Sequence, residues 1–373
     1  MIYLDNAATT KINPIAQEAR NKSENETYAN SSSMHSFAME SARLIKESKE
    51  ILAGVLNCSP SEIYFTKGAT ESNNIAIHSF ESKDKIALTS KIEHSSVYET
   101  LKASGFKEVI YLDNDQSGFI DLDDMADKIT DDVSFVSIIY VNNEIGTIQD
   151  ITAISKIIRY KNPNIVIHID ATQALGKISC DVEALDVDMM SFSAHKIYGP
   201  KGIGGMFVRK DIIDKIRPIM LGGNQQVISS GTDSHPAIYG FAIALRELVA
   251  SEEYSYIREL NTYMRDLIAA NISEYSFNTP DENSSPYILS VGFKGIKSEV
   301  LLHMLEQNEI YVSSGSACSK GVNNRVLTAL GVDSAYMDGV IRFSFSSELS
   351  KEDLDYTVKV LADSIGTIRK VMG

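Results

Sequence analysis

The chain has 373 residues, of which 43% are hydrophobic, 35 basic and 50 acidic, and its formal net charge is −15. This length exceeds what one simple core usually holds, so we expect a large domain and a smaller one. The acidic balance argues against direct nucleic-acid binding, which needs a basic face. No apolar run reaches the ~18 residues of a membrane span, and "MIYLDNAATT" at the start does not have the pattern of a signal peptide.

The three cysteines, Cys58, Cys180 and Cys318, are widely spaced and odd in number. This usage predicts a reducing compartment without a disulfide framework, and we therefore expect a cytoplasmic location. There is no CxxC pair, so a structural zinc site is not expected and we assign no metal ligand.

Short apolar runs alternate with helical patterns through most of the chain. Several runs are apolar on both faces, as strands of a covered parallel sheet must be. The segments between them, such as 151–161, have helical spacing. The pattern predicts an α/β fold with a mostly parallel sheet and helices on both sides. The seven predicted strands are 62–66, 85–90, 108–113, 133–141, 165–170, 188–193 and 204–209.

The pattern changes near residue 250. Residues 246–272 predict one long amphipathic helix that leads into a second domain. That domain has predicted strands at 287–293 and 339–346 and a helix at 298–308. We expect residues 15–250 to form the large domain, and residues 1–14 with 251–373 to form a smaller α+β domain.

Ligands of an open α/β sheet bind beyond the carboxyl ends of the strands, so the residues that follow each strand are the first candidates. Gly68, Ala69 and Thr70 follow the first strand where a helix should begin. Free backbone N–H groups at a helix start, with the Thr70 hydroxyl, suit an anion, although an ordinary N-cap explains the same residues.

His94 and the pair Asn142 and Asn143 follow two further strands. Each could contact a ligand, but a single histidine is more often structural and paired asparagines usually form turns. Alone, none of these residues predicts a binding site; they become candidates only together with Asp170 and Lys196, described next.

Asp170 ends the strand at 165–170, and Gln173 lies three residues later. A carboxylate at the end of a buried strand is costly unless it meets a positive partner. It is either part of a salt bridge or helix cap, or the counter-ion of a ligand cation.

Lys196 lies in "SFSAHKIYGPKG", between a strand and a Gly-Pro turn, with Ser193 and His195 beside it. It is either a solvated turn residue or a partly desolvated amine whose lowered pKa allows Schiff-base chemistry. A carboxylate, an amine, a helix start with hydroxyls and an imidazole, in this order on strand ends, together predict a pyridoxal 5'-phosphate (PLP) site.

Cys318 lies in "YVSSGSACSKG", a composition typical of a surface loop. Next to Lys320 it could react as a thiolate, or it could be an inert loop cysteine. Cys58 and Cys180 have no such setting and we interpret them as structural. Arg342, inside a predicted apolar strand, needs a planar acid, either a substrate carboxylate or an internal Asp or Glu.

The chain resembles the cysteine desulfurases, which are PLP enzymes of the class V aminotransferase group within fold type I. The resemblance covers nearly the whole length, and the "SSGSACS" loop is similar to that of the group supplying sulfur to iron–sulfur cluster assembly or tRNA thiolation. The motifs that carry it are "YLDNAATT", "FTKGATESNN", "EHSSV", "VNNEIGTIQDI", "HIDATQALGK", "SFSAHKIYGPKGIGG", "SGT", "SSGSACS" and "IRFS".

The resemblance implies a role for each matching residue. Lys196 would form the Schiff base and His94 would stack on the pyridine ring, while Cys318 would take sulfur from L-cysteine and leave alanine. Asp170 would pair with the ring nitrogen, and Arg342 with Asn30 would hold the substrate carboxylate. The remaining cofactor contacts would come from Ala69, Thr70, Asn143, Gln173, Ser193 and His195, and from Thr232 of a neighbouring subunit. The implied partners are L-cysteine, a second copy of the chain in a homodimer, and a sulfur acceptor, either a cluster scaffold or a tRNA-thiolating enzyme.

Two positions depart from the family pattern: Ser229 replaces the usual arginine before Ser230-Gly231-Thr232, and Ser31 replaces a proline in "NSSSMH". Two other functions are therefore weighed. One is a PLP-dependent class V aminotransferase or selenocysteine lyase, against which the cysteine loop argues. The other is a non-enzymatic copy acting as a regulator, against which the retained Lys196, Asp170 and Cys318 argue.

Overall fold

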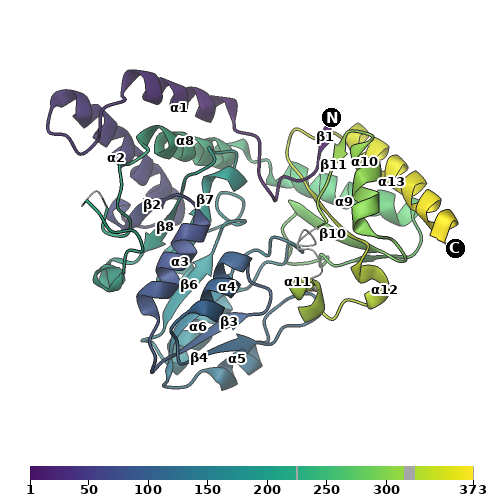
Figure 1. Ribbon diagram of the computed structural model, residues 1–373, viewed down its shortest axis with the longest axis horizontal. Helices are drawn as coiled ribbons and strands as arrows, with labels where there is room; N and C mark the ends of the chain where they lie inside the picture. Colours follow the sequence, from purple (N-terminus) through teal and green to yellow (C-terminus); the bar gives the residue numbers. More distant parts are fainter. Residues whose placement is uncertain (224–225, 315–323, 373) are drawn as a thin grey trace.

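A computed structural model describes residues 1–223, 226–314 and 324–372. Its main sheet has seven strands in the order β2-β8-β7-β6-β5-β3-β4 (Figure 1). β8 runs opposite to the other six strands, so its pairings with β2 and β7 are antiparallel and the remaining pairings are parallel. The predicted sheet and its strands are thereby confirmed, with ends that shift by one or two residues. The strands are β2 (Ile63–Thr66), β3 (Ile86–Ser90), β4 (Glu108–Leu112), β5 (Val133–Ile139), β6 (Val166–Asp170), β7 (Met189–Ser193) and β8 (Gly204–Val208).

Helices cover both faces of this sheet. Along β5, Val136 and Ile138 pack into a core shared with helices α2, α6 and α8, whereas Phe135 points into a separate core with α3 and α4. Burial on both faces explains why the strands read as continuous apolar runs. The helices of this part are α1 (Pro14–Glu26), α2 (Ser36–Leu56), α3 (Ala69–Phe80), α4 (Ser95–Ala103), α5 (Leu122–Lys128), α6 (Ile151–Lys161), α7 (Val182–Leu185) and α8 (His235–Ser251).

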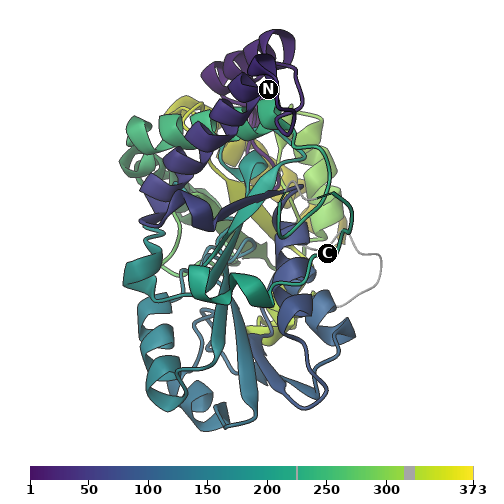
Figure 2. The same cartoon turned by 90° about the vertical axis from the view of Figure 1, so that its left-hand side faces the viewer.

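The remaining elements gather around a three-stranded antiparallel sheet in the order β12-β10-β9, on the right of Figure 1. Its core is separate from the cores of the main sheet. Figure 2 shows the part built on the main sheet from the side, with α1 and α2 at the top and the β3–β4 region at the bottom. The elements here are α9 (Tyr254–Asn271), β9 (Tyr275–Phe277), β10 (Ile288–Phe293), α10 (Ser298–Glu306), β11 (Ile310–Tyr311), α11 (Arg325–Ala329), α12 (Ser334–Met337), β12 (Val340–Ser344) and α13 (Lys351–Met372).

The N-terminal segment connects the two sheets. Strand β1 (Ile2–Tyr3) pairs in parallel with β11. Seven residues after the end of β1, the Thr10 N–H donates to the His195 carbonyl, just beyond the main sheet. Residues 4–9 therefore cross between the sheets, where they form part of the site described below.

The single helix predicted over 246–272 is wrong. Helix α8 ends at Ser251 and α9 begins at Tyr254, because Glu252 adopts a left-handed conformation with φ of 51°. The Glu253 carboxylate accepts hydrogen bonds from the hydroxyls of Tyr198, Tyr287 and Ser347 at 2.9, 3.2 and 2.6 Å. These tertiary contacts fix the break, which local apolar spacing does not reveal.

Within the described ranges, no helix is long and apolar enough to cross a membrane. The same residues contain no group of three or more His, Cys, Asp or Glu side chains placed to hold a metal ion.

Candidate active site

A cavity of about 400 Å³ lies at the carboxyl ends of β6 and β7. Chain segments far apart in sequence meet there: the N-terminal crossing segment, the starts of α3 and α4, and the β12 strand. The predicted site residues that line it are Ala69, Thr70, His94, Asn143, Asp170, Gln173, Ser193, His195, Lys196 and Arg342.

Asp170 provides the negative charge of the cavity. It is the last residue of β6 and only 2% exposed. Its Oδ2 accepts a hydrogen bond from Asn73 Nδ2 at 2.9 Å, and its Oδ1 accepts one from the Thr172 N–H at 3.0 Å. Both donors are neutral amides, and within the described part of the chain the buried carboxylate forms no ion pair.

Lys196 provides an amine. It follows β7 in a short 3-10 turn (Ala194–Lys196), and its Nζ donates to the carbonyls of Ala7 at 2.7 Å and Ala8 at 2.6 Å. Burial lowers the pKa of Lys196 to about 8, and the charge of Arg342 acts in the same direction, against Asp5 and Asp170. A substantial fraction of the amine is therefore neutral, and so nucleophilic, near pH 8.

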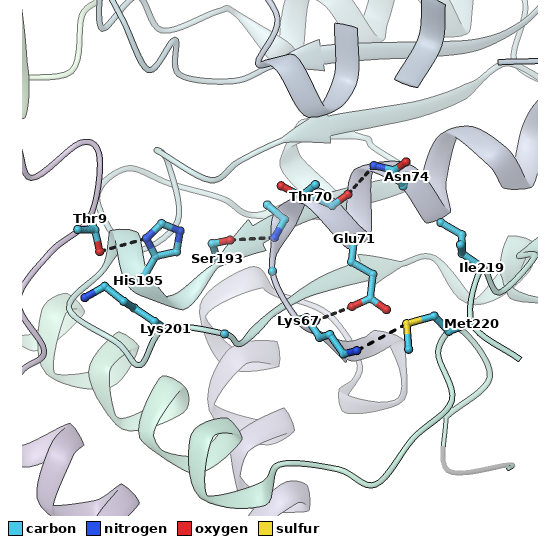
Figure 3. A pocket seen from close by; sticks show the side chains of 13 residues that line it. Thr9, Lys67, Thr70, Glu71, Asn74, Ser193, His195, Lys201, Ile219 and Met220 are labelled. Carbon is cyan, nitrogen blue, oxygen red and sulfur yellow. Dashed lines mark hydrogen bonds between the residues drawn. The ribbon is translucent and has the colours of Figure 1, made fainter. Parts of the chain in front are cut away.

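The start of α3 forms an anion-binding corner. Gly68 precedes the helix with φ of 153°, in the region that favours glycine, and as the N-cap residue it has no side chain to cap the helix. The Ala69 N–H donates to Ser193 Oγ at 2.8 Å, which ties the helix start to the end of β7 (Figure 3). Thr70 lines the same corner. A helix N-terminus with hydroxyls beside it suits a phosphate.

His195 lies next to this corner, with its Nδ1 at 3.3 Å from Thr9 Oγ1 (Figure 3). Burial and the charges of Lys196, Lys201 and Lys177 lower its pKa to about 4. The ring is therefore neutral at physiological pH and can offer a hydrogen bond to an anion without needing to carry charge.

His94 and Gln173 line other parts of the cavity. His94 is the N-cap of α4, and its exposed ring lines the cavity. Gln173 Nε2 donates to the Ala7 carbonyl at 2.9 Å, while its Oε1 accepts from Lys177 Nζ at 3.4 Å. Desolvation lowers the pKa of His94, so this imidazole stays neutral to a lower pH than an ordinary histidine does.

Arg342 has an internal acid as its partner. Its Nη2 donates to Asp5 Oδ1 at 2.8 Å and its Nη1 donates to the Asn143 carbonyl at 2.8 Å. Its buried Nε has no hydrogen-bond partner among the described residues. The internal-acid alternative therefore describes this pair, although Arg342 also lines the cavity and keeps donor capacity on that side.

Three predicted residues are not brought into the cavity by the described structure. Thr232 is exposed in the segment before α8, and Asn30 is exposed in the loop between α1 and α2, where its Oδ1 accepts from the Ser32 N–H. Cys318 lies outside the described residues.

The other two cysteines have unreactive settings. Burial raises the pKa of both Cys58 and Cys180 to about 12, so both thiols stay protonated. This protonation agrees with their interpretation as structural residues.

Several residues of the site were not singled out from the sequence. Asp5, Ala7, Ala8 and Thr9 come from the first crossing segment, although "YLDNAATT" had been noted as a motif. Asn73 and Ser96, which join Asp170 to His94, were also missed. Asn73 lies within the motif "FTKGATESNN", so the family motif could have pointed to it. The search for residues that directly follow a strand could not, because Asn73 lies inside α3.

The donors and acceptors of the cavity fit PLP. Asp170 forms no ion pair among the described residues, so a protonated pyridine nitrogen would supply its counter-charge. The α3 start with Ser193 suits a phosphate. Lys196, with its depressed pKa, lines the same cavity.

The family model of the class V aminotransferases matches residues 2–357. "Cysteine desulfurase IscS" of Dictyoglomus turgidum is 38% identical over 382 residues, covering 99% of this chain and 96% of that protein. A solved "NifS-like protein" superposes with a TM-score of 0.91 at 35% identity, covering 98% of this chain and 99% of the other. The structure titled "SspA in complex with cysteine" gives a TM-score of 0.80 at 31% identity, covering 92% and 99%. The chain therefore belongs to the PLP-dependent class V aminotransferase family and, within it, to the cysteine desulfurases.

Proposed function

We propose that the protein binds PLP in this cavity and removes sulfur from L-cysteine, which leaves L-alanine and a persulfide on Cys318. The observation that carries the proposal is the buried Asp170 carboxylate, which accepts hydrogen bonds from two neutral donors, in the same cavity as an amine whose pKa is about 8. Few other ligands need both a counter-ion for a ring cation and an amine for a carbonyl. The family membership and the cysteine-bound relative support cysteine as the substrate.

The residues that would hold PLP divide by its chemical groups. Asp170 would pair with the ring nitrogen, His94 would stack on the ring, and Gln173 and Asn143 would face the ring oxygen. The phosphate would lie against Ala69, Thr70, Ser193 and His195. When bound, PLP supplies an electron sink that stabilises negative charge on the amino acid carbon atoms.

Lys196 and His94 are the proposed proton carriers. Because the pKa of the Lys196 amine is about 8, its neutral and protonated forms are both populated near that pH. The amine can therefore accept a proton and return it during the reaction. The His94 imidazole is neutral for the reason given above, so it can offer its ring N–H to the reacting atoms without carrying a charge.

Arg342 is the proposed anchor of the substrate carboxylate. Asp5 and the Asn143 carbonyl hold its guanidinium at fixed distances of 2.8 Å. Pre-positioning reduces the entropy cost of binding, and a fork-shaped cation suits a carboxylate. Asn30 would join it only after a movement of the α1–α2 loop.

The test of the function is incubation with L-cysteine and a reductant, with alanine and sulfide measured together. Cys318→Ala should abolish sulfide release while the visible absorbance of bound PLP remains. Cys58→Ala is the matched control, because its thiol stays protonated and should not matter. Full activity of Cys318→Ala would refute the assigned nucleophile.

Transfer of the amino group to a 2-oxo acid without sulfide would instead identify an aminotransferase. Release of selenide from L-selenocysteine, with no sulfide from L-cysteine, would identify a selenocysteine lyase. A purified protein that stays colourless after PLP is added would revive the regulatory alternative.

A homodimer is the proposed assembly. The exposed Thr232 would reach the phosphate of the other subunit's cofactor, as the family resemblance implies. Met220 and Leu221 expose apolar side chains, and Met220 lines a second pocket beside the α3 start (Figure 3). Exposed apolar side chains of this kind support an interface with a second subunit here. Light scattering should give twice the chain mass, and a monomer would contradict the proposal.

The sulfur acceptor is proposed only by class. A protein scaffold for iron–sulfur clusters and a tRNA-thiolating enzyme are the two candidates. The persulfide-loaded protein should transfer its sulfur to one of these when they are mixed, as followed by mass spectrometry of both partners.

A further inference from the structure

A chain of hydrogen bonds joins the Asp170 carboxylate to the His94 imidazole through two residues outside the proposed cofactor contacts. Asn73 Nδ2 donates to Asp170 Oδ2 at 2.9 Å and to Ser96 Oγ at 2.8 Å. Ser96 Oγ lies 2.8 Å from His94 Nδ1. The four side chains come from α3, α4 and the end of β6, so they connect two helices to the main sheet.

The direction of each bond in this chain is fixed. The Asp170 oxygens accept from the Thr172 N–H and from Asn73, which orients the Asn73 amide with its nitrogen toward the carboxylate. In the opposite orientation the amide oxygen would face a carboxylate oxygen. Both protons of Asn73 Nδ2 are then used, one on Asp170 and one on Ser96, while the buried Oδ1 has no partner among the described residues.

The state of His94 follows from its neighbours. The backbone N–H of Ser96 donates to His94 Nδ1 at 3.2 Å, and a backbone N–H can only donate. Ser96 Oγ accepts from Asn73, so its own proton is free to point to the same Nδ1. A nitrogen that receives two donors cannot also carry a proton, which leaves the proton of the neutral ring on Nε2.

We propose that Asn73 and Ser96 are positioning residues that hold His94 as the Nε2–H tautomer, and that the Asp170 carboxylate sets this state through them. The tautomer is a property of the chain alone; what the Nε2 proton does in the reaction rests on the proposed function. In this state Nε2 is the donor nitrogen, so His94 can give a proton or a hydrogen bond through Nε2 but cannot accept a proton there. A change at Asp170 would affect His94 through Asn73 and Ser96, without direct contact.

The test is a long-range ¹H–¹⁵N correlation spectrum of the full chain carrying ¹⁵N-labelled histidine, with and without PLP. The chain has seven histidines, and His94→Gln identifies the signals of interest. Spectra are recorded above the ordinary histidine pKa of about 6.5, where the ring is neutral. In the unmodified protein, Nε2 should be protonated and Nδ1 should show the shift of an acceptor nitrogen.

Ser96→Ala should lower the ratio of Nε2–H to Nδ1–H by about three- to tenfold, the range expected from one hydrogen bond. Ser96→Thr keeps the hydroxyl and should restore the ratio. Ser104→Ala is the matched control, because it removes a hydroxyl at the other end of α4 that donates to the Leu101 carbonyl and is far along the helix from His94. An Nδ1–H ring in the unmodified protein, or a ratio unchanged in Ser96→Ala, would overturn the proposal.

Asn73→Leu tests the link to Asp170. The ratio should fall in the same direction but by less, because Ser96 can still donate to His94. An unchanged ratio in a folded Asn73→Leu protein would overturn the role of Asp170. If that variant does not fold, Asp170→Asn tests the same link. None of these spectra depends on cysteine turnover, so failure of the proposed function would leave their outcome intact.

Discussion

The cavity has two walls that the chain builds in different ways. The sheet wall, formed by Asp170, Gln173, Ser193, His195 and Lys196, comes from β6, β7 and the residues that follow them. The cross-chain wall, formed by Ala7, Ala8, Ser313 and Arg342, joins the two ends of the chain around Asp5. The first wall is anchored by the main sheet, which is buried on both faces. The second combines Arg342, on a strand of the three-stranded sheet, with N-terminal residues held by hydrogen bonds and by the Arg342–Asp5 ion pair. Groups for charge and proton chemistry lie mainly on the first wall, and the proposed substrate anchor lies on the second.

Replacing Lys196 should have the largest effect. Lys196→Ala removes the amine of the sheet wall and should reduce sulfide release from L-cysteine by at least about 100-fold, the lower end of the range for proton-transfer groups. Lys210→Ala, which changes an exposed lysine after β8, should leave the rate unchanged. If Lys196→Ala releases sulfide at a rate within tenfold of the unmodified protein, the Lys196 amine is not needed for the reaction and the proposed role of the sheet wall is wrong.

Asp170→Asn should come next. The substitution keeps the shape but removes the charge that would balance a ring cation, so we expect about a 100-fold slower reaction and weaker PLP binding. Titration of the visible absorbance with added PLP measures the binding. Unchanged affinity and rate would mean that the buried carboxylate only caps its own turn.

Asp5→Asn probes the cross-chain wall. It removes the charge that positions Arg342, and we expect a KM for L-cysteine about three- to tenfold higher with little change in PLP absorbance. The free energy of unfolding should fall by about 2 kcal/mol, because Arg342 is left buried beside a neutral partner. If kcat falls and KM does not, the division between the two walls is wrong.

Lys177→Met should have the smallest effect, seen in the pH dependence of stability. Burial lowers the pKa of Lys177 from 10.5 to about 7, so between these values the unfolded chain binds more protons than the folded one. The stability of the unmodified protein relative to Lys177→Met should therefore rise with pH above about 7, by less than about 1.4 kcal/mol between pH 7 and pH 8. Urea unfolding at the two pH values measures it, and a difference that falls with pH would contradict the sign.

The sheet wall was predictable because periodicity locates strands and the ligands of such sheets lie at strand ends. Asp170, Ser193 and Lys196 follow from that rule alone. The partner of Arg342 was not predictable, because Asp5 lies 337 residues away in the sequence. The break between α8 and α9 was missed for a similar reason, since Glu253 is held by Tyr198 and Tyr287.

Asn73 and Ser96, which lie behind the cavity, could not be predicted from the sequence for a different reason. Asn73 and Ser96 lie within helices, where a polar residue in an amphipathic pattern usually means a solvated face. Only the packing of α3 against β6, and of α4 against α3, turns them toward Asp170 and His94. Asn30 shows the converse, because the resemblance assigns it to the substrate while its loop lies outside the cavity.

The most direct test of the account is to add PLP, reduce the protein with borohydride and find the modified peptide by mass spectrometry. Two buried amines with lowered pKa values compete, Lys196 in the cavity and Lys177 behind Gln173. The account predicts a pyridoxyl group on the peptide that contains Lys196. A modification on Lys177, or none at all, would contradict it.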